Sequence, residues 1–275
     1  MKKIIFGLLT IGMTFNPVVS EARTSYKLLF GALGALGGAT MVYKNHKQHA
    51  NLENNQPETQ SDCSHNLYGK GPGKTSSIKM VCKRNFAVAF NTKTKTPLWV
   101  SERLTYSAVS LGVERSNDFH SEPVLGSLSP QPTDYARSGY DRGHMAPAAD
   151  MPDEYSMHES FSMANMVPQT ATLNRQVWSE LESRIRKESN QYSELYVITG
   201  PVGQAGRLNN GSVVPTHCFK VVIYPNGSTT AYLVENKDYE LPKNRYESKN
   251  MINGILNASI VDLKTLESYT GFRFY

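Results

Sequence analysis

One predicted helix, placed between two β-type regions, constrains the fold of this chain most strongly. Leu173, Val177, Leu181 and Ile185 recur every four residues. This spacing predicts an amphipathic helix over residues 173–187, with Arg and Glu on its other faces. The regions before and after it carry strand patterns instead. Strands, then a helix, then strands indicate an α+β fold.

The expected strands are short apolar runs bounded by turn residues. Phe86, Val88 and Phe90 alternate with smaller residues, and the apolar pattern resumes at 98–100 after a turn at 91–97. This arrangement predicts a β-hairpin. Further strands are expected at 195–199, 213–224 and 229–234, with an Asn-Gly turn at 226–227 between the last two. Shorter helices are expected at 154–164 and after Val261.

The amino terminus indicates export. Lys2 and Lys3 precede an apolar run over 4–15, and small residues follow at Ser20 and Ala22. This order is typical of a secretory signal peptide, which we assign to residues 1–22. The remainder of the chain is therefore expected in the periplasm or outside the cell.

Residues 23–60 are interpreted as an apolar tether or anchor followed by a polar linker. The stretch 28–43 has no charged residue but is slightly shorter than the roughly 20 residues that a bilayer span needs. Two alternatives remain: a cleaved signal followed by a weakly apolar tether, or an uncleaved membrane anchor. Residues 44–62 have the composition of a solvated linker. A single domain is expected over 61–275.

The charge and the cysteine content restrict the partners and the compartment that suit this chain. The chain has 29 Lys and Arg against 24 Asp and Glu, a formal net charge of +5, which suits an anionic partner. The spacing of the three cysteines contains no CxxC or Cys/His ligand pair of the kind that zinc sites use, so a structural zinc ion is not expected. Cys63 and Cys82 would close a short loop and could pair in an oxidising compartment. Cys218 lies in an apolar run and is expected to be a buried core residue.

The segment Asp141-Arg142-Gly143-His144 concentrates residues suited to phosphate chemistry. A neutral His accepts a proton from water near pH 7, an Arg neutralises phosphate oxygens, and a Gly permits close approach of the backbone. The alternative is a surface turn with a hydrogen-bonded His.

A second group lies on the predicted helix. Asn174 opens this helix, and Glu182 follows two turns later, so the two side chains are expected to face the same cleft. An Asn oxygen is a neutral hard ligand, and Mg²⁺ keeps most of its waters while taking one or two protein oxygens. The alternative is that Asn174 only caps the helix.

These motifs together resemble the family of DNA/RNA non-specific endonucleases, the ββα-metal nucleases. The resemblance rests on the DRGH run, on Ala164-Asn165-Met166-Val167-Pro168-Gln169, and on LNRQVW at 173–178 with Glu182 at a fixed offset. It covers about residues 63–275. It implies an α+β fold with a ββα-metal (His-Me finger) core on a central antiparallel sheet.

The resemblance also implies roles for individual residues. His144 would be the general base and Asn174 the protein ligand of Mg²⁺, with Mn²⁺ as an alternative metal. Glu182 would hold the metal's water shell. Asn165 would help to position His144 and the scissile phosphate. Arg142, together with Arg115 in a looser match, would stabilise the charge that develops on phosphorus.

The function implied is an exported, Mg²⁺-dependent, sugar-non-specific endonuclease that leaves 5′-phosphate ends on DNA and RNA. Weak sequence preference follows, because a site that grips phosphates reads no base edges. Dimerisation is common among members of the family, so the resemblance implies that this protein could form a homodimer. Two alternatives stay open: a catalytically silent nucleic-acid-binding or uptake protein with the same fold, and a phosphodiesterase for another anionic polymer or small ester.

Overall fold

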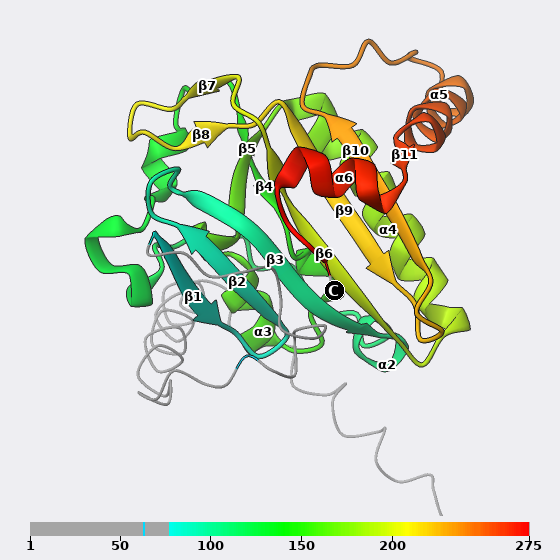
Figure 1. Cartoon of the computed structure of the whole chain (residues 1–275), viewed down its shortest axis with the longest axis horizontal. Coiled ribbons are helices and arrows are strands. Elements are labelled where there is room, and N and C mark those ends of the chain that lie inside the picture. The colour runs from blue at the N-terminus through cyan, green and yellow to red at the C-terminus, as the bar shows by residue number, and fades with distance from the viewer. Residues whose placement is uncertain (1–62, 64–76, 275) are drawn as a thin grey trace, which may run out of the picture. The chain divides into compact units, whose positions relative to one another are not determined.

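The computed structural model describes Cys63 and residues 77–274, and it is built around one antiparallel sheet (Figure 1). Within these residues, seven strands pair in the order β1-β2-β3-β6-β9-β10-β11. Their bounds are β1 Ile78–Cys82, β2 Phe86–Asn91, β3 Thr96–Thr105, β6 Glu194–Val202, β9 His217–Ile223, β10 Thr229–Glu235 and β11 Ile260–Val261.

The predicted α+β class and the central antiparallel sheet are confirmed. Strands β2 and β3 form the expected hairpin. The expected run 213–224 is divided between a two-residue strand β8, Val213–Val214, and β9. The turn between β9 and β10 contains Gly227 at φ +80°, a conformation that its sequence favours. Strand β1 was not anticipated.

A two-stranded ribbon lies outside the main sheet and carries the DRGH segment. It consists of β4, Asp141–His144, and β5, Met166–Gln169, paired antiparallel with His144 opposite Met166. The next helical element begins at Leu173. Ribbon and helix therefore form a β-β-α unit, in agreement with the predicted ββα core. The strand β7, Gly206–Arg207, pairs with β8 in a second short ribbon.

The helices cover both faces of the sheet, and the predicted central helix is present over its full expected extent. Its first part is a π-helix, η6, Leu173–Trp178, which continues into α4, Ser179–Glu188. The helix expected at 154–164 ends earlier, as α3, Glu154–Ser160, and the one expected after Val261 is α6, Leu263–Thr270. The described helices also include α2, Tyr106–Val109, and α5, Arg245–Ala258, which the sequence did not predict.

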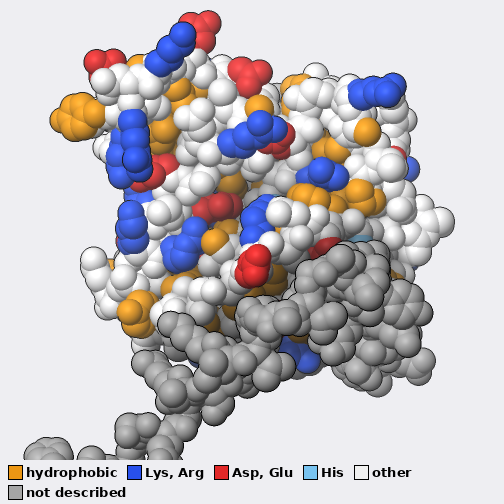
Figure 2. All heavy atoms as spheres, turned by 180° about the vertical axis from the view of Figure 1, so that it is seen from behind, with side chains coloured by type: hydrophobic (Ala, Val, Ile, Leu, Met, Phe, Trp, Pro, Cys, Tyr) orange, Lys and Arg blue, Asp and Glu red, His pale blue; other side chains and the backbone are white. Residues whose placement is uncertain are grey.

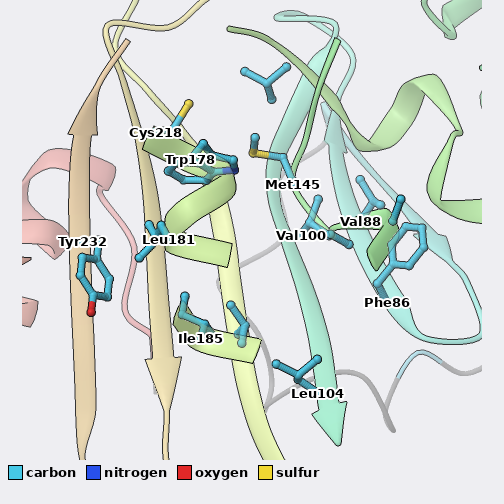
Figure 3. Packing of buried hydrophobic residues seen from close by; sticks show 14 of the residues in the cluster. Phe86, Val88, Val100, Leu104, Met145, Trp178, Leu181, Ile185, Cys218 and Tyr232 are labelled. Carbon is cyan, nitrogen blue, oxygen red and sulfur yellow. The ribbon is translucent and has the colours of Figure 1, made fainter. Parts of the chain in front are cut away.

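The core is formed by the two faces of the sheet. On one face Trp178, Leu181 and Ile185 pack toward strands that carry residues such as Val100 and Leu104 (Figure 3). On the other face Leu266 and Phe274 cover residues that include Trp99, Ile198 and Phe219. The helical repeat that defined the central helix thus faces the sheet, which fixes the direction in which its polar side chains point.

The amino-terminal assignments fall outside the described residues, except for one cysteine. The signal peptide at 1–22, the tether at 28–43 and the linker belong to the part that is not described. Cys63 is bonded to Cys82, as the pairing expectation proposed, and Cys218 is buried with a free thiol. No helix in the described part of the chain has the length and apolar content that a membrane crossing requires.

Gly143 fits the ribbon only because it has no side chain. A Cβ atom there would lie 2.0 Å from Oε1 of Gln169, which is fully buried and cannot move into solvent. We therefore expect Gly143→Ala to lower the free energy of unfolding by about 1–3 kcal/mol. Gly254→Ala is the matched control, because Gly254 lies in helix α5 with open space around it. Its expected effect is a gain of up to ~1 kcal/mol.

Urea denaturation of both variants beside the wild type measures this difference. A Gly143→Ala protein as stable as the Gly254→Ala protein would show that the ribbon can open around a methyl group, contrary to the close packing found here.

Candidate active site

His144 ends strand β4 and packs against two aromatic rings, which also contact one another. Its ring centroid is 4.8 Å from that of Phe161 in an edge-on arrangement and 5.7 Å from that of Phe119. The side chain is buried, and its Nε2 has no hydrogen-bond partner among the described residues. A buried imidazole nitrogen with a free acceptor position can take a proton from a water molecule that reaches it.

Two arginines share the same aromatic pair. The Arg142 guanidinium lies 4.1 Å from the centroid of Phe119, and the Arg115 guanidinium lies 4.9 Å from that of Phe161. Burial, and then the positive charges of Arg115 and Arg142, lower the pKa of His144 to about 3. His144 is therefore neutral near pH 7, with two cationic groups beside it that suit a phosphate diester.

Asn165 supports His144 through the backbone. Its Oδ1 accepts from the Ala146 N–H at 2.9 Å, and its Nδ2 donates to the carbonyls of Ala146 and Ser160, each at 2.9 Å. Its own carbonyl accepts from the N–H of Met145, at 3.1 Å. Asn165 thus fixes the chain directly after His144, while its predicted action on the phosphate stays a prediction.

Asn174 is held by an acidic residue of strand β4. Its Nδ2 donates to Oδ2 of Asp141 at 2.9 Å, so its Oδ1 is left as the acceptor. Arg175 donates to both oxygens of Asp141, each at 2.7 Å, and these bonds lower the pKa of that carboxyl. The alternative that Asn174 only caps the helix is wrong. The N-cap of η6 is Thr172, and Asn174 lies inside the helix.

Glu182 lies on α4 in a cluster of buried charges. Burial is the largest effect and raises the pKa of its carboxyl to about 7. The charges of Lys220 and Arg115 lower that pKa, and Glu102 raises it further. The same charge of Glu182 acts on Arg115 and raises its pKa against the effect of burial. Arg115 is therefore close in space to both Glu182 and His144.

The donor set fits a hard divalent cation. Asn174 offers an amide oxygen and Glu182 a carboxylate, which are the ligand types that Mg²⁺ takes directly or through water. Asp141 orients the amide of Asn174 so that its oxygen stays available. Arg115 connects two of the predicted site residues, because its charge acts on both His144 and Glu182. Asn174 is positioned separately, through its hydrogen bond to Asp141.

Sequence reasoning missed several residues that shape the site. Phe119 and Phe161, which form the aromatic frame around His144, belong to no sequence motif that would have indicated them. Lys220 is 1% exposed, donates to Thr199 Oγ1 at 2.8 Å and carries a charge that acts on Glu182. A lysine inside the apolar run of β9, and likewise Glu102 within β3, were signals that could have been used.

A groove with basic side chains lies next to this site. It runs between η6 with the start of α4 and the segment that leads into α5, and it is lined by Arg175, Lys243, Arg245 and Lys249 among others. Figure 2, which views the molecule from behind, shows Lys and Arg side chains gathered along the edge on which α5 lies. Arg184 lies on α4 but does not line this groove; it donates to Asn253 and Asn257 and joins α4 to α5.

The β-β-α unit carries His144 and Arg142 on its ribbon and the oriented Asn174 on its helix, and this arrangement agrees with the class of ββα-metal nucleases. A profile of the DNA/RNA non-specific endonuclease family matches residues 63–275. A nuclease of Nostoc sp. is 31% identical over 214 residues, 76% of this chain and 78% of the relative. Mitochondrial endonuclease G of Bos taurus is 28% identical over 196 residues, 63% of this chain and 64% of the relative.

The solved structures agree on the fold. The crystal structure of a complex between EndoG and EndoGI, described as revealing the mechanism of EndoG inhibition, matches with a TM-score of 0.63 and 24% identity. The match covers 78% of this chain and 92% of that chain. The chain belongs to the DNA/RNA non-specific endonuclease family, and it is an enzyme that acts on nucleic acids. The family consists of metal-dependent nucleases.

The lowered pKa of His144 has a consequence for stability. Below its ordinary value of 6.5 and above about 3, the unfolded chain binds a proton at this residue and the folded protein does not. The free energy of unfolding should therefore fall as the pH drops through this window, by up to about 1.4 kcal/mol per pH unit from this group. His144→Gln removes that contribution.

Urea denaturation in metal-free buffer, at several pH values from 6.5 downward, measures the effect. The difference in stability between wild type and His144→Gln should shrink or reverse toward acid pH. A difference that does not change with pH would show that His144 protonates equally in both states.

Proposed function

We propose that this protein is an exported, Mg²⁺-dependent endonuclease that hydrolyses DNA and RNA to products with 5′-phosphate and 3′-hydroxyl ends. The observation that carries the proposal is the neutral, buried His144, whose Nε2 has no hydrogen-bond partner among the described residues and which has two arginines beside it. A base held in this form accepts the proton that an attacking water must lose.

The chemistry assigns each step to a group on the protein. His144 takes a proton from water at Nε2, the water oxygen bonds to phosphorus, and the bond from phosphorus to the 3′ oxygen breaks. The phosphate therefore stays on the 5′ oxygen of the downstream nucleotide, and the departing 3′ oxygen takes a proton from solvent to become a hydroxyl. Arg142 and Arg115 neutralise the charge on the non-bridging oxygens. A phosphate between these arginines also offsets the charges that depress the pKa of His144, which makes His144 a stronger base when substrate is bound.

Asn174 would hold the Mg²⁺ through Oδ1, and Glu182 would hold its water shell. When bound, the ion supplies charge stabilisation at the departing 3′ oxygen. Asp141 keeps the Asn174 amide in the orientation that this requires. Mn²⁺ accepts the same oxygen ligands and is proposed as an alternative.

Contacts to the nucleic-acid backbone are assigned to the basic groove beside η6. Arg175, Lys243, Arg245 and Lys249 line it and would follow successive phosphates. Such contacts carry no base information, so little sequence preference is expected on either DNA or RNA.

Export is supported by two independent features. Residues 1–22 have the order of a signal peptide. Cys63 and Cys82 form a disulfide with Cα atoms 5.2 Å apart, which an oxidising compartment maintains. A membrane tether through residues 28–43 and a homodimer remain parts of the proposal that rest on the sequence and on the family.

The catalytic role of His144 is tested by His144→Ala on supercoiled plasmid and single-stranded RNA, with Mg²⁺ or EDTA. Loss of the base should reduce cleavage of both substrates by about 10²–10⁴-fold or more, while DNA binding is retained. His217→Ala serves as the matched control, because this histidine lies on β9 outside the site. Cleavage by His144→Ala close to the wild-type rate would reject the general-base assignment.

The same assay separates the alternatives. A wild-type protein that binds DNA but leaves plasmid and RNA intact with several divalent metals would support a silent binding protein instead. Cleavage of small phosphodiesters alone would support an enzyme for another anionic substrate.

The role of Asp141 is tested by a Mg²⁺ titration. Asp141→Ala frees the Asn174 amide to rotate, so we expect the Mg²⁺ concentration for half-maximal cleavage to rise by about 10–100-fold. Arg175→Ala is the comparison, because it removes one partner of Asp141 but leaves the bond to Asn174. Measured at saturating DNA, it should shift the midpoint much less. Equal shifts in both variants would argue against orientation of Asn174 by Asp141.

A further inference from the structure

Two histidines and an aspartate that are far apart in the sequence meet beside the active site. Asp118 and His120 flank Phe119, whose ring lies against that of His144, and His158 belongs to α3. One ligand atom from each of Asp118, His120 and His158 lies within 4.8 Å of the other two. The sites proposed so far use none of these three side chains.

Backbone hydrogen bonds hold the two ligand-bearing segments together. The N–H of His120 donates to the Phe161 carbonyl at 3.3 Å, and the N–H of Met163 donates to the His120 carbonyl at 2.8 Å. His120 and Ser162 form a parallel β-bridge. Because the main chain is already fixed, little conformational entropy is lost when the side chains converge on an ion.

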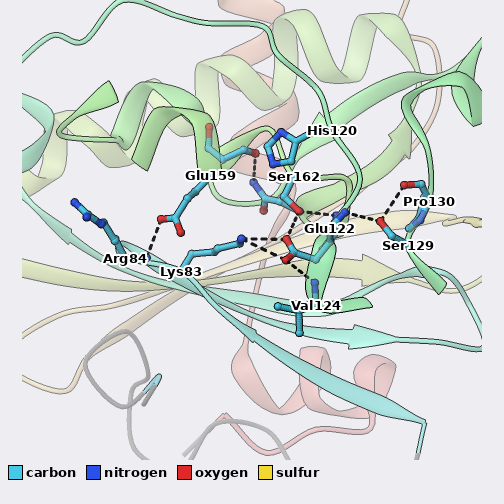
Figure 4. A network of polar contacts seen from close by, with 12 residues as sticks. Lys83, Arg84, His120, Glu122, Val124, Ser129, Pro130, Glu159 and Ser162 are labelled. Atoms are coloured by element: carbon cyan, nitrogen blue, oxygen red, sulfur yellow. Dashed lines mark hydrogen bonds and ion pairs between the residues drawn. The ribbon is translucent and has the colours of Figure 1, made fainter. Parts of the chain in front are cut away.

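A buried polar network anchors the same segment just beyond His120 (Figure 4). Glu122 is fully buried. Its Oε2 forms an ion pair with Lys83 Nζ at 3.1 Å and accepts a hydrogen bond from the Ser162 hydroxyl at 2.6 Å. Lys83 is held in this ion pair, although its charge still acts on His120. The network fixes the chain just beyond His120, so the position of this side chain is defined before an ion binds.

The hydrogen bonding of His120 leaves the correct nitrogen for a metal. Its Nδ1 lies 2.9 Å from the backbone carbonyl of Asp118, so Nδ1 carries the proton and donates it. Nε2 then has its lone pair available. A ring N–H that donates to a backbone carbonyl while the other nitrogen binds the ion is the usual arrangement of a metal-ligating histidine.

His158 and Asp118 are already in direct contact through Nδ1 and Oδ2. The rings of His120 and His158 are stacked, with centroids 4.2 Å apart and an angle of 7° between planes. A metal ion would replace the proton between His158 and Asp118 and tilt the two rings so that their lone pairs converge. The Asp118 side chain is 27% exposed, which leaves a path for the ion from solvent.

We propose that Asp118, His120 and His158 form a binding site for a borderline transition-metal ion, with Zn²⁺ the best fit. Two imidazoles and one carboxylate, with a fourth position for water, form a common tetrahedral zinc set. Mg²⁺ prefers an all-oxygen set, so this site and the Asn174 centre select different ions. Bound Zn²⁺ ties the segment that carries Phe119 to α3 and thereby stabilises the wall of the His144 pocket.

The test uses the full chain, from which metal ions are first removed with EDTA. The protein is then dialysed against Zn²⁺ in the presence of excess Mg²⁺, which occupies sites with oxygen ligands only. We expect one Zn²⁺ per chain in the wild type. In His120→Gln and His158→Gln the affinity for Zn²⁺ should fall by at least about 100-fold. Loss of a residue that only supports a ligand costs about 10–100-fold, and loss of a ligand itself should cost at least as much. His217→Gln removes a histidine outside the cluster and should bind like the wild type.

A second readout does not depend on counting metal. Zn²⁺ at about 100 times its dissociation constant should raise the Tm of the wild type by roughly 5–10 °C. The rise should be absent in His120→Gln, which keeps the contact between His158 and Asp118 and is expected to fold. The visible spectrum of the Co²⁺-substituted protein should report tetrahedral nitrogen ligation.

The proposal is overturned if the wild type takes up no Zn²⁺, or if both cluster variants bind it and gain Tm as the wild type does. Loss of binding in His144→Ala but not in His120→Gln would place the zinc at the catalytic histidine and would also overturn it. These outcomes do not depend on nuclease activity, so they stand apart from the test of the proposed function.

Discussion

The carboxylate of Asp141 joins the two halves of the β-β-α unit, and the site depends on this junction. It lies at the start of β4, three residues before His144, and accepts hydrogen bonds from Asn174 and Arg175 at the start of η6. The strand that carries the proposed base and the helix that carries the proposed ligand are thereby held in one orientation. The π-helical form of η6 fits this requirement, because irregular turns of this kind recur at functional sites.

Opposing charges then set the chemistry at that junction. Burial, and then the charges of Arg115 and Arg142, depress the pKa of His144, whereas Lys220 and Arg115 partly offset the effect of burial on the pKa of Glu182. Arg115 acts on both groups, so any anion that it binds changes both at once. A phosphate that approaches these arginines raises the basicity of His144 and weakens the attraction between Arg115 and Glu182. In the proposed mechanism, substrate binding and activation of His144 are thus linked through one side chain, Arg115.

The parts of the site that follow from local patterns could be predicted from the sequence. The repeat from Leu173 to Ile185 gave the central helix, and the DRGH run placed His144 and Arg142 because all these residues belong to short continuous segments. Features created by long-range packing could not be predicted in this way. Helix α5 has a mixed surface without a clear apolar stripe, and β1 is short with only one buried residue besides its half-buried positions. The frame of Phe119 and Phe161 exists only once two distant segments meet.

That aromatic frame also explains why a histidine can be both buried and useful. Nε2 of His144 is shielded from solvent, so a water molecule or a phosphate reaches it only when a neighbouring side chain moves. Arg142 belongs to strand β4 and Phe161 is fully buried, whereas the residues before Phe119, Arg115 among them, lie outside any helix or strand. The residues before Phe119 are therefore the part of the wall that can yield with least loss of packing, whereas His120 is fixed by backbone hydrogen bonds to the chain after α3. The contact of Asp118 with His158 ties this part of the wall to α3, which connects the second cluster to the geometry of the first.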